Sequence, residues 1–188
     1  MQTGKQILLS STISLFTAVA AISGNASGNA DDTTGGVLVF FPNTSKDPRS
    51  LNCSNGYPVV RFIHKLPSTL DSIRYALDEL LDGPNEEEKV RGYVSPIPRS
   101  NQITRYMKLA GEKLGWRMED TCVAITRIAV HRDTAFVEFS TSMRTYGGGS
   151  CLAAAISGPI RQTILQFPVV KHVRFLIEGV QGEDVFQP

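Results

Sequence analysis

The chain has 188 residues, of which 41% are hydrophobic and 20% charged, so it can bury one substantial core and is too short for two full domains. Its formal net charge is only +1, and its basic residues are scattered along the chain. Phosphate backbones are bound by clustered Lys and Arg, so this charge pattern argues against nucleic acid as a partner.

Residues 1–30 differ from the rest of the chain. Lys5 is their only charged residue, and Ile7–Ile22 is apolar apart from small hydroxyl residues. A lone positive charge, an apolar segment too short for a comfortable membrane span and a small-residue exit are typical of a secretory signal peptide. We expect export to a secreted or periplasmic location, cleavage near Ala26 or Ala30, and no membrane span in the mature chain. Loss of Lys5 would leave 18 basic and 18 acidic residues.

The predicted domain covers residues 37–179, between a polar linker at 31–36 and a polar tail at 180–188. Its first elements are two strands. Val37–Phe41 and Pro58–His64 are rich in β-branched and aromatic residues, and each is bounded by a proline. The long loop between these strands is rich in Asn, Ser, Asp and Pro and carries the first cysteine.

A helix follows the second strand. Ser68 and Asp71 have the spacing of a capping box, and apolar residues at helical spacing continue to Leu81. Gly83-Pro84 then ends the helix. The acidic residues Glu86–Glu88 predict a short solvated helical turn.

A second helix is predicted around residues 101–114, where apolar residues recur at helical spacing up to Gly115. Its apolar stripe either covers the domain's own sheet or contacts another protein, and packing within the domain is the default expectation. The candidate partner-binding residues are this stripe and the tryptophan that follows it: Ile103, Tyr106, Met107, Leu114 and Trp116.

The last third of the sequence predicts a hairpin, a helix and a strand. Cys122–Val130 and Thr134–Phe139 form the hairpin, Ser150 is the expected N-cap of a helix that ends at Pro168, and Val173–Glu178 alternates like a strand. The order of all these elements predicts an α+β fold. It consists of a mixed β-sheet with two main helices packed on one face, plus an inserted helix, the one around residues 101–114.

Four segments carry a family resemblance through their order and spacing: LDELLDGPNEEEKVRGYVSPIP at 77–98, TAFVEFS at 134–140, GGGSCLAAAI at 147–156 and TILQFPVVKHVRFLIEG at 163–179. Together they resemble the GerMN domain family, a bacterial sporulation and spore-germination domain that also occurs in exported proteins of non-sporulating bacteria. The resemblance implies a small α/β domain similar to ring-building motifs. It also implies a role outside the cytoplasm in protein interaction or assembly, without catalytic residues, metal or cofactor.

The three cysteines lie too far apart for Cys-x-x-Cys zinc or redox motifs. In an oxidising compartment, three cysteines suggest one disulfide and one leftover thiol. We expect the disulfide between Cys53 and Cys122, because both lie at segment edges outside the predicted core. Cys151 opens the last helix, where the helix dipole favours a reactive thiolate, but we favour a small, buried, unreactive residue there.

Two further patterns could bind a ligand. The glycine run Gly147–Gly149 before a helix could hold an anion through exposed amides, but no Lys or Thr follows as in a phosphate-binding loop, so we favour a tight structural connection. The histidines His64, His131 and His172 lack ligand-like spacing. We therefore expect no metal site and no cofactor.

The function we expect is an exported, non-catalytic protein-interaction or assembly module of GerMN type in the bacterial cell envelope. Its partners would be envelope or extracellular proteins, and self-association is left open. A small-ligand or cell-wall-glycan binding module is the alternative, and a cysteine-dependent enzyme is the third hypothesis.

Overall fold

The structure, a computed structural model, describes residues 35–49, 52–63, 68–106, 108–109, 121–146, 149–178 and 186. Its elements in chain order are the strands β1 (Gly35–Phe41) and β2 (Tyr57–Ile63), the helices α1 (Thr69–Asp82), α2 (Glu86–Val90) and α3 (Ser100–Tyr106), the strands β3 (Ile125–His131) and β4 (Thr134–Phe139), the short helix η2 (Thr141–Tyr146), the helix α4 (Ser150–Leu165) and the strand β5 (His172–Ile177). The predicted leader, residues 1–30, lies outside the described ranges. Within those ranges, no helix combines the length and apolar character needed to cross a membrane.

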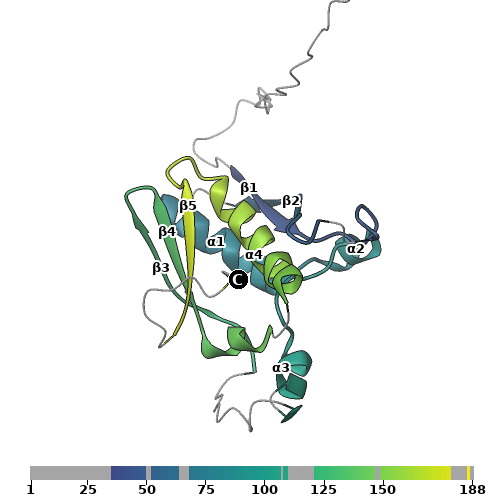
Figure 1. Ribbon diagram of the computed structural model, residues 1–188. Helices are drawn as coiled ribbons and strands as arrows, with labels where there is room; N and C mark the ends of the chain where they lie inside the picture. Colours follow the sequence, from purple (N-terminus) through teal and green to yellow (C-terminus); the bar gives the residue numbers. More distant parts are fainter. Residues whose placement is uncertain are drawn as a thin grey trace, which may run out of the picture. The chain divides into compact units, whose positions relative to one another are not determined.

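The strands form two sheets, with α1 and α4 between them (Figure 1). β1 and β2 form an antiparallel pair, while in the second sheet β4 pairs antiparallel with β3 and parallel with β5. Both helices contact β1 on one side, and on the other side α1 contacts β3 and α4 contacts β5. The α+β class predicted from the sequence is confirmed. The predicted mixed sheet is present but holds only β3, β4 and β5. β1 and β2 form a separate antiparallel sheet, so the two main helices lie between two sheets.

The division into two sheets has a physical cause at the outer edge of β1. Gln166, just after α4, donates from Nε2 to the carbonyl of Leu38 at 2.6 Å and accepts the N–H of Leu38 on Oε1 at 2.7 Å. The N–H of Phe40 donates to Oγ1 of Thr163 at 3.1 Å. Side chains at the end of α4 therefore take the place that a third strand would occupy, and the β1–β2 pair stays separate from the mixed sheet.

The main core is built from the inward faces of both sheets and the two enclosed helices. Val39 and Phe41 of β1 are fully buried, as are Val137 and Phe139 of β4. α1 contributes Ile73, and α4 contributes other buried apolar residues. Alternate residues of β1, β4 and β5 are therefore buried, as the period of two in the sequence predicts.

The ends of α1 follow the sequence signals. The Oγ atom of Ser68 accepts the N–H of Asp71 at 3.2 Å, which caps the first turn. Gly83 ends the helix with φ of 86°, and its N–H donates to the carbonyl of Glu79 at 3.1 Å. A positive φ favours glycine, so this end of the helix is encoded locally.

The helix α4 lies between the parallel strands β4 and β5 in the chain, and a hydrogen bond joins it to β5. Arg161 donates from Nη1 to the carbonyl of Val173 at 2.5 Å, and its guanidinium lies 4.6 Å from the ring centre of Phe175. Phe186 also packs against Phe175 in an edge-to-face arrangement, with the ring centres 5.4 Å apart. Phe186 is buried, so this residue of the predicted polar tail belongs to the core.

A buried ion pair fixes β2 to the helices beneath it. Arg61 donates through Nη1 and Nη2 to the two carboxylate oxygens of Glu88 at 2.6 and 2.8 Å, and through Nε to Glu79 at 2.9 Å. Glu88 also closes a capping box with Asn85 at the start of α2. Glu88 is only 3% exposed, so the prediction that Glu86–Glu88 forms a solvated turn is wrong at this residue.

Hydrogen bonding to Arg61 lowers the pKa of Glu88, with a further contribution from the backbone at Asn85, although burial opposes the shift. A lowered folded-state pKa means that this stabilisation is complete above the unfolded-state pKa of about 4.3 and is lost as pH falls through the folded-state pKa.

We expect Glu88→Gln to lower the free energy of unfolding by about 3 kcal/mol at pH 7, because it leaves Arg61 partly buried with Glu79 as its remaining partner. The difference from the parent protein should shrink as pH falls below about 4. Urea unfolding at a series of pH values measures both effects. Glu86→Gln, on the exposed side of the same helix, is the control and should change little. A pH-independent difference at Glu88 would contradict this account.

Candidate functional site

The loop between β1 and β2 begins with a buried asparagine. The Oδ1 atom of Asn43 accepts the N–H groups of Ser45 and Lys46, both at 2.9 Å, and its Nδ2 donates to the carbonyl of Arg91 at 3.1 Å. Asn43 also forms an antiparallel bridge with Tyr93. One side chain therefore shapes the turn and fastens it to the segment after α2.

The other end of the same loop packs closely on α4. The N–H of Gly56 donates to Oε1 of Gln162 at 2.9 Å. A Cβ atom on Gly158 would overlap the backbone of Ser54, and one on Gly56 would overlap Gln162 and Phe40. Glycine is therefore needed at both positions, because the loop and the helix backbone approach each other too closely for any side chain.

This close approach joins two cysteines. Cys53, in the loop, forms a disulfide with Cys151, in the first turn of α4, across a sequence separation of 98 residues. The predicted Cys53–Cys122 disulfide is wrong, and so is the prediction of Cys151 as a small, buried, unreactive residue. Cys122 is a free, exposed thiol before β3, where it lines a different pocket with Leu81.

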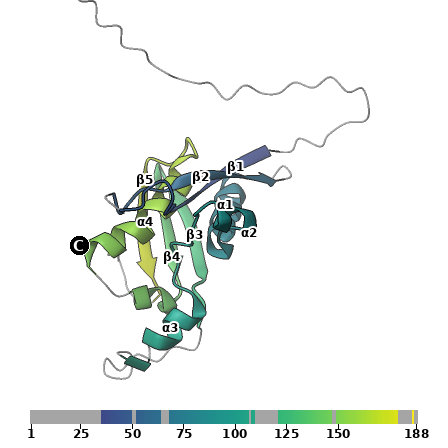
Figure 2. The same ribbon diagram turned by 90° about the vertical axis from the view of Figure 1, so that its right-hand side faces the viewer.

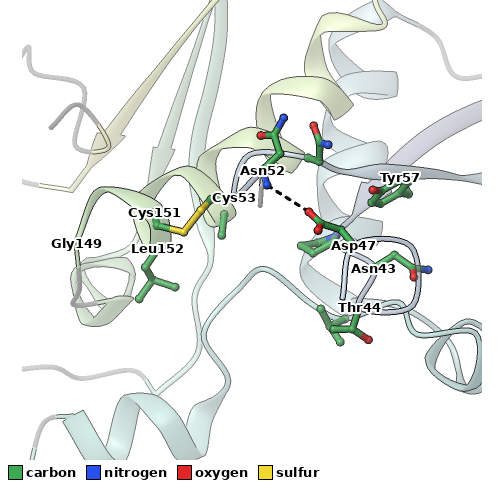
Figure 3. Close-up of a pocket in the computed structure, with 13 residues that line it drawn as sticks. Asn43, Thr44, Asp47, Asn52, Cys53, Tyr57, Gly149, Cys151 and Leu152 are labelled. Carbon is green, nitrogen blue, oxygen red and sulfur yellow. Dashed lines mark hydrogen bonds between the residues drawn. A yellow bond between two sulfur atoms is a disulfide. The ribbon is translucent and has the colours of Figure 1, made fainter. Parts of the chain in front are cut away.

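The disulfide forms part of the wall of a pocket (Figure 3). The pocket has a volume of about 540 Å³, which lies in the usual range for ligand sites. One wall is the β1–β2 loop and the other is the start of α4. The lining residues are Pro42, Asn43, Thr44, Asp47, Asn52, Cys53, Asn55, Tyr57, Val94, Gly149, Cys151, Leu152 and Ala155.

Most polar side chains of this pocket already have a bond within the protein. Asn43 holds the turn described above, and the hydroxyl of Thr44 donates to the carbonyl of Gly92 at 3.2 Å. Asp47 accepts the N–H of Asn52 at 3.4 Å (Figure 3). These bonds keep the loop wall in one conformation, while the opposite wall offers apolar surface at Leu152. The arrangement suits binding by shape and apolar contact.

No group of three or more His, Cys, Asp and Glu side chains that could hold a metal ion occurs in the part of the chain that the structure describes. Ser150 was predicted as the N-cap of α4, but Gly149 occupies that position and no side chain caps the helix. Gly147 and Gly148 lie outside the described residues, so the anion-binding alternative for the glycine run stays a hypothesis.

The candidate partner-binding residues of the inserted helix have different outcomes. The helix is present as α3, over the first part of the predicted range, and packs against η2. Ile103 is fully buried, so the prediction that it binds a partner is wrong. Its side chain packs within the domain, which was the default expectation for this helix. Tyr106 is half-buried. Met107, Leu114 and Trp116 lie outside the described residues, so a role for them in partner binding stays a prediction.

Sequence reasoning missed the pocket because each of its walls has an unremarkable local sequence. Asn43 follows a proline at the end of a strand, a common turn signal, but nothing local shows that its side chain is buried. Gly158 precedes a proline inside a helix, an unusual place for glycine. That glycine was the one signal that another backbone segment packs against α4.

No protein-family model and no curated protein matches the sequence. Solved structures do match. The tandem GerMN domains of the sporulation protein GerM from Bacillus subtilis are 19% identical, with a TM-score of 0.49 over 84% of this chain and 44% of that one. The first GerMN domain of GerM is 15% identical, with a TM-score of 0.45 over 81% of this chain and 90% of that one.

The chain is similar to a GerMN domain. A candidate lipoprotein from Clostridium perfringens is a further match, at 14% identity and a TM-score of 0.44 over 84% of this chain and 85% of that one. The chain spans less than half of the tandem GerM structure and most of the single GerMN domain.

We expect the double variant Cys53→Ser/Cys151→Ser to be less stable by about 3–5 kcal/mol, because the disulfide closes a loop of nearly 100 residues in the unfolded chain. Urea unfolding of the oxidised protein measures the loss. Cys122→Ser is the matched control and should leave stability nearly unchanged, since that thiol is free and exposed. Equal stability of the double variant and the parent protein would contradict the assigned bond.

Proposed function

We propose that this chain is an exported, non-catalytic protein-interaction module of GerMN type that works outside the cytoplasm. The proposal rests on the pocket beside the disulfide, where an apolar residue of a partner protein would insert. Support comes from the sequence resemblance to a family of exported interaction domains. The disulfide supports the location, since disulfides persist in oxidising compartments and are rare in the cytosol.

The apolar surface of the pocket is what favours a protein partner. Leu152 lines the pocket and is 42% exposed, and Val94, which also lines it, is 39% exposed. Large apolar side chains grouped around a hollow are typical of protein interaction sites. The wall formed by the β1–β2 loop is held by hydrogen bonds and by the disulfide, so binding would cost little ordering of the loop.

The test begins with finding the partner. A photo-crosslinking residue at position 152, in the exported protein in living cells, should give a specific covalent adduct that mass spectrometry identifies. The same residue at position 165 is the control. Leu165 lies on the same helix at nearly the same exposure, 43%, but does not line this pocket.

With the purified partner, we expect Leu152→Lys to weaken binding by at least about tenfold, because it places a charge against an apolar wall. Leu165→Lys should change the dissociation constant by less than about twofold. Isothermal titration calorimetry measures both values. Equal adducts at the two positions, or unchanged affinity of Leu152→Lys, would refute the pocket as the interaction site.

A small ligand is the second candidate, and one observation favours it. Asp47, Asn52 and Asn55 bring carboxylate and amide groups to the pocket, which Tyr57 also lines. Such groups can bond the hydroxyls of a cell-wall glycan. In this case soluble muropeptides should raise the melting temperature in a concentration-dependent manner, and Leu165→Lys should keep the effect. No shift at millimolar muropeptide would remove this candidate.

A further inference from the structure

The β1–β2 sheet has one edge that α4 does not close. The outer edge of β1 is occupied by the side chains of Gln166 and Thr163, as described above. The outer edge of β2 carries exposed apolar residues: Val60 is 51% exposed and Phe62 75%. Exposed strand edges pair readily with other strands, so natural proteins usually protect them or use them.

The register of the pair shows which backbone groups of β2 face outward. Leu38 lies opposite Val60, and both its N–H and its carbonyl bond to Gln166, away from β2. In an antiparallel pair, two opposed residues either exchange both backbone bonds or direct both away from each other. Val60 therefore directs its N–H and its carbonyl away from β1. The backbone groups of Pro58 and Phe62, two residues away on either side, face outward in the same way.

These three residues give the edge a particular order of donors and acceptors. Pro58 has only a carbonyl, because proline lacks an N–H. Val60 has both groups. Phe62 has its N–H, but its carbonyl already accepts the hydroxyl of Tyr75 at 3.2 Å. From Pro58 to Phe62 the outward groups are thus an acceptor, a donor with an acceptor, and a donor.

We propose that a second copy of this chain pairs antiparallel with this edge, with Val60 opposite Val60 on a two-fold axis. That register also places Phe62 opposite the partner's Pro58. The two valines exchange both of their backbone bonds, and each Phe62 N–H donates to the carbonyl of the opposite proline. Pro58 has no N–H to donate, and it lies opposite the Phe62 carbonyl, which already accepts the Tyr75 hydroxyl. Every outward group of the three residues is thereby matched.

This match favours a second copy over another extended chain. A strand without proline at that position would direct a second N–H at the Phe62 carbonyl, so this donor and the Tyr75 hydroxyl would have to share one oxygen. The pairing also brings each Phe62 side chain beside the partner's Pro58 on the exposed face, a favourable cross-strand contact. The result is a four-stranded sheet in which both β2 edges are closed.

The β2 edge is separate from the pocket beside the disulfide, so the two proposals can fail independently. Leu152→Lys, which tests the pocket, should dimerise like the parent protein. The tests of the edge in turn use residues that do not line the pocket.

The first test is sedimentation of the protein expressed from the full sequence, over a wide range of concentrations. We expect a reversible monomer–dimer equilibrium, weakened by at least about tenfold in Val60→Lys, which places two like charges opposite each other on the axis. Leu38→Lys is the matched control, because Leu38 lies on the same face but on the strand that α4 closes. It should change the dissociation constant by less than about twofold. A monomer at every concentration, or equal effects of the two substitutions, would overturn the proposal.

The second test reads the register directly. Residues that exchange both bonds across an antiparallel pair have Cα atoms about 5.5 Å apart, within the range of a disulfide. Val60→Cys in a Cys122→Ser background should therefore crosslink two chains on mild oxidation, whereas Leu38→Cys in that background should not. Dimers that form without a crosslink at position 60 would show that another surface associates, which overturns this register.

Discussion

The disulfide between Cys53 and Cys151 is the constraint on which the candidate site depends. The described residues of the long loop between β1 and β2, 42–49 and 52–56, contribute little to the apolar core, so burial alone gives them few contacts. It is held instead by the buried Asn43, by the bond from Gly56 to Gln162 and by the covalent tie to α4. The disulfide fixes the position of this loop beside the first turn of α4, and the pocket is the space that the two segments enclose.

One helix, α4, serves three purposes in the molecule. Its first turn supplies a wall of the pocket, its middle has the glycine against which the loop packs, and its end closes the outer edge of β1. The last of these leaves β2 as the edge available to another chain. The pocket and the proposed dimer surface therefore depend on the same helix, although they share no binding residue. A change that displaces α4 should affect both.

Features encoded by a few neighbouring residues could be predicted from the sequence, and features made by distant residues could not. The N-cap at Ser68 and the glycine end of α1 depend on residues a few positions apart, and both are confirmed. The Asp71 carboxylate accepts the Ser68 hydroxyl in place of the backbone N–H that a full capping box would use. The partner of Cys53 depends on how a loop packs on a helix about 100 residues later. In the sequence, Glu88 is one of three consecutive acids and is predicted to be solvated, because nothing local shows that Arg61 binds it. In the same way, Phe186 is predicted to belong to the polar tail, because its contact with Phe175 cannot be seen in the sequence.

The most direct test of this account is disulfide mapping of the exported protein, digested with trypsin without reduction. We predict that the peptide spanning residues 50–61, which contains Cys53, is linked to the peptide spanning residues 145–161, which contains Cys151. The Cys122 peptide should be alkylated as a free thiol. A link between the Cys53 and Cys122 peptides, or a Cys53 peptide with a free thiol, would contradict the account of the loop and its pocket.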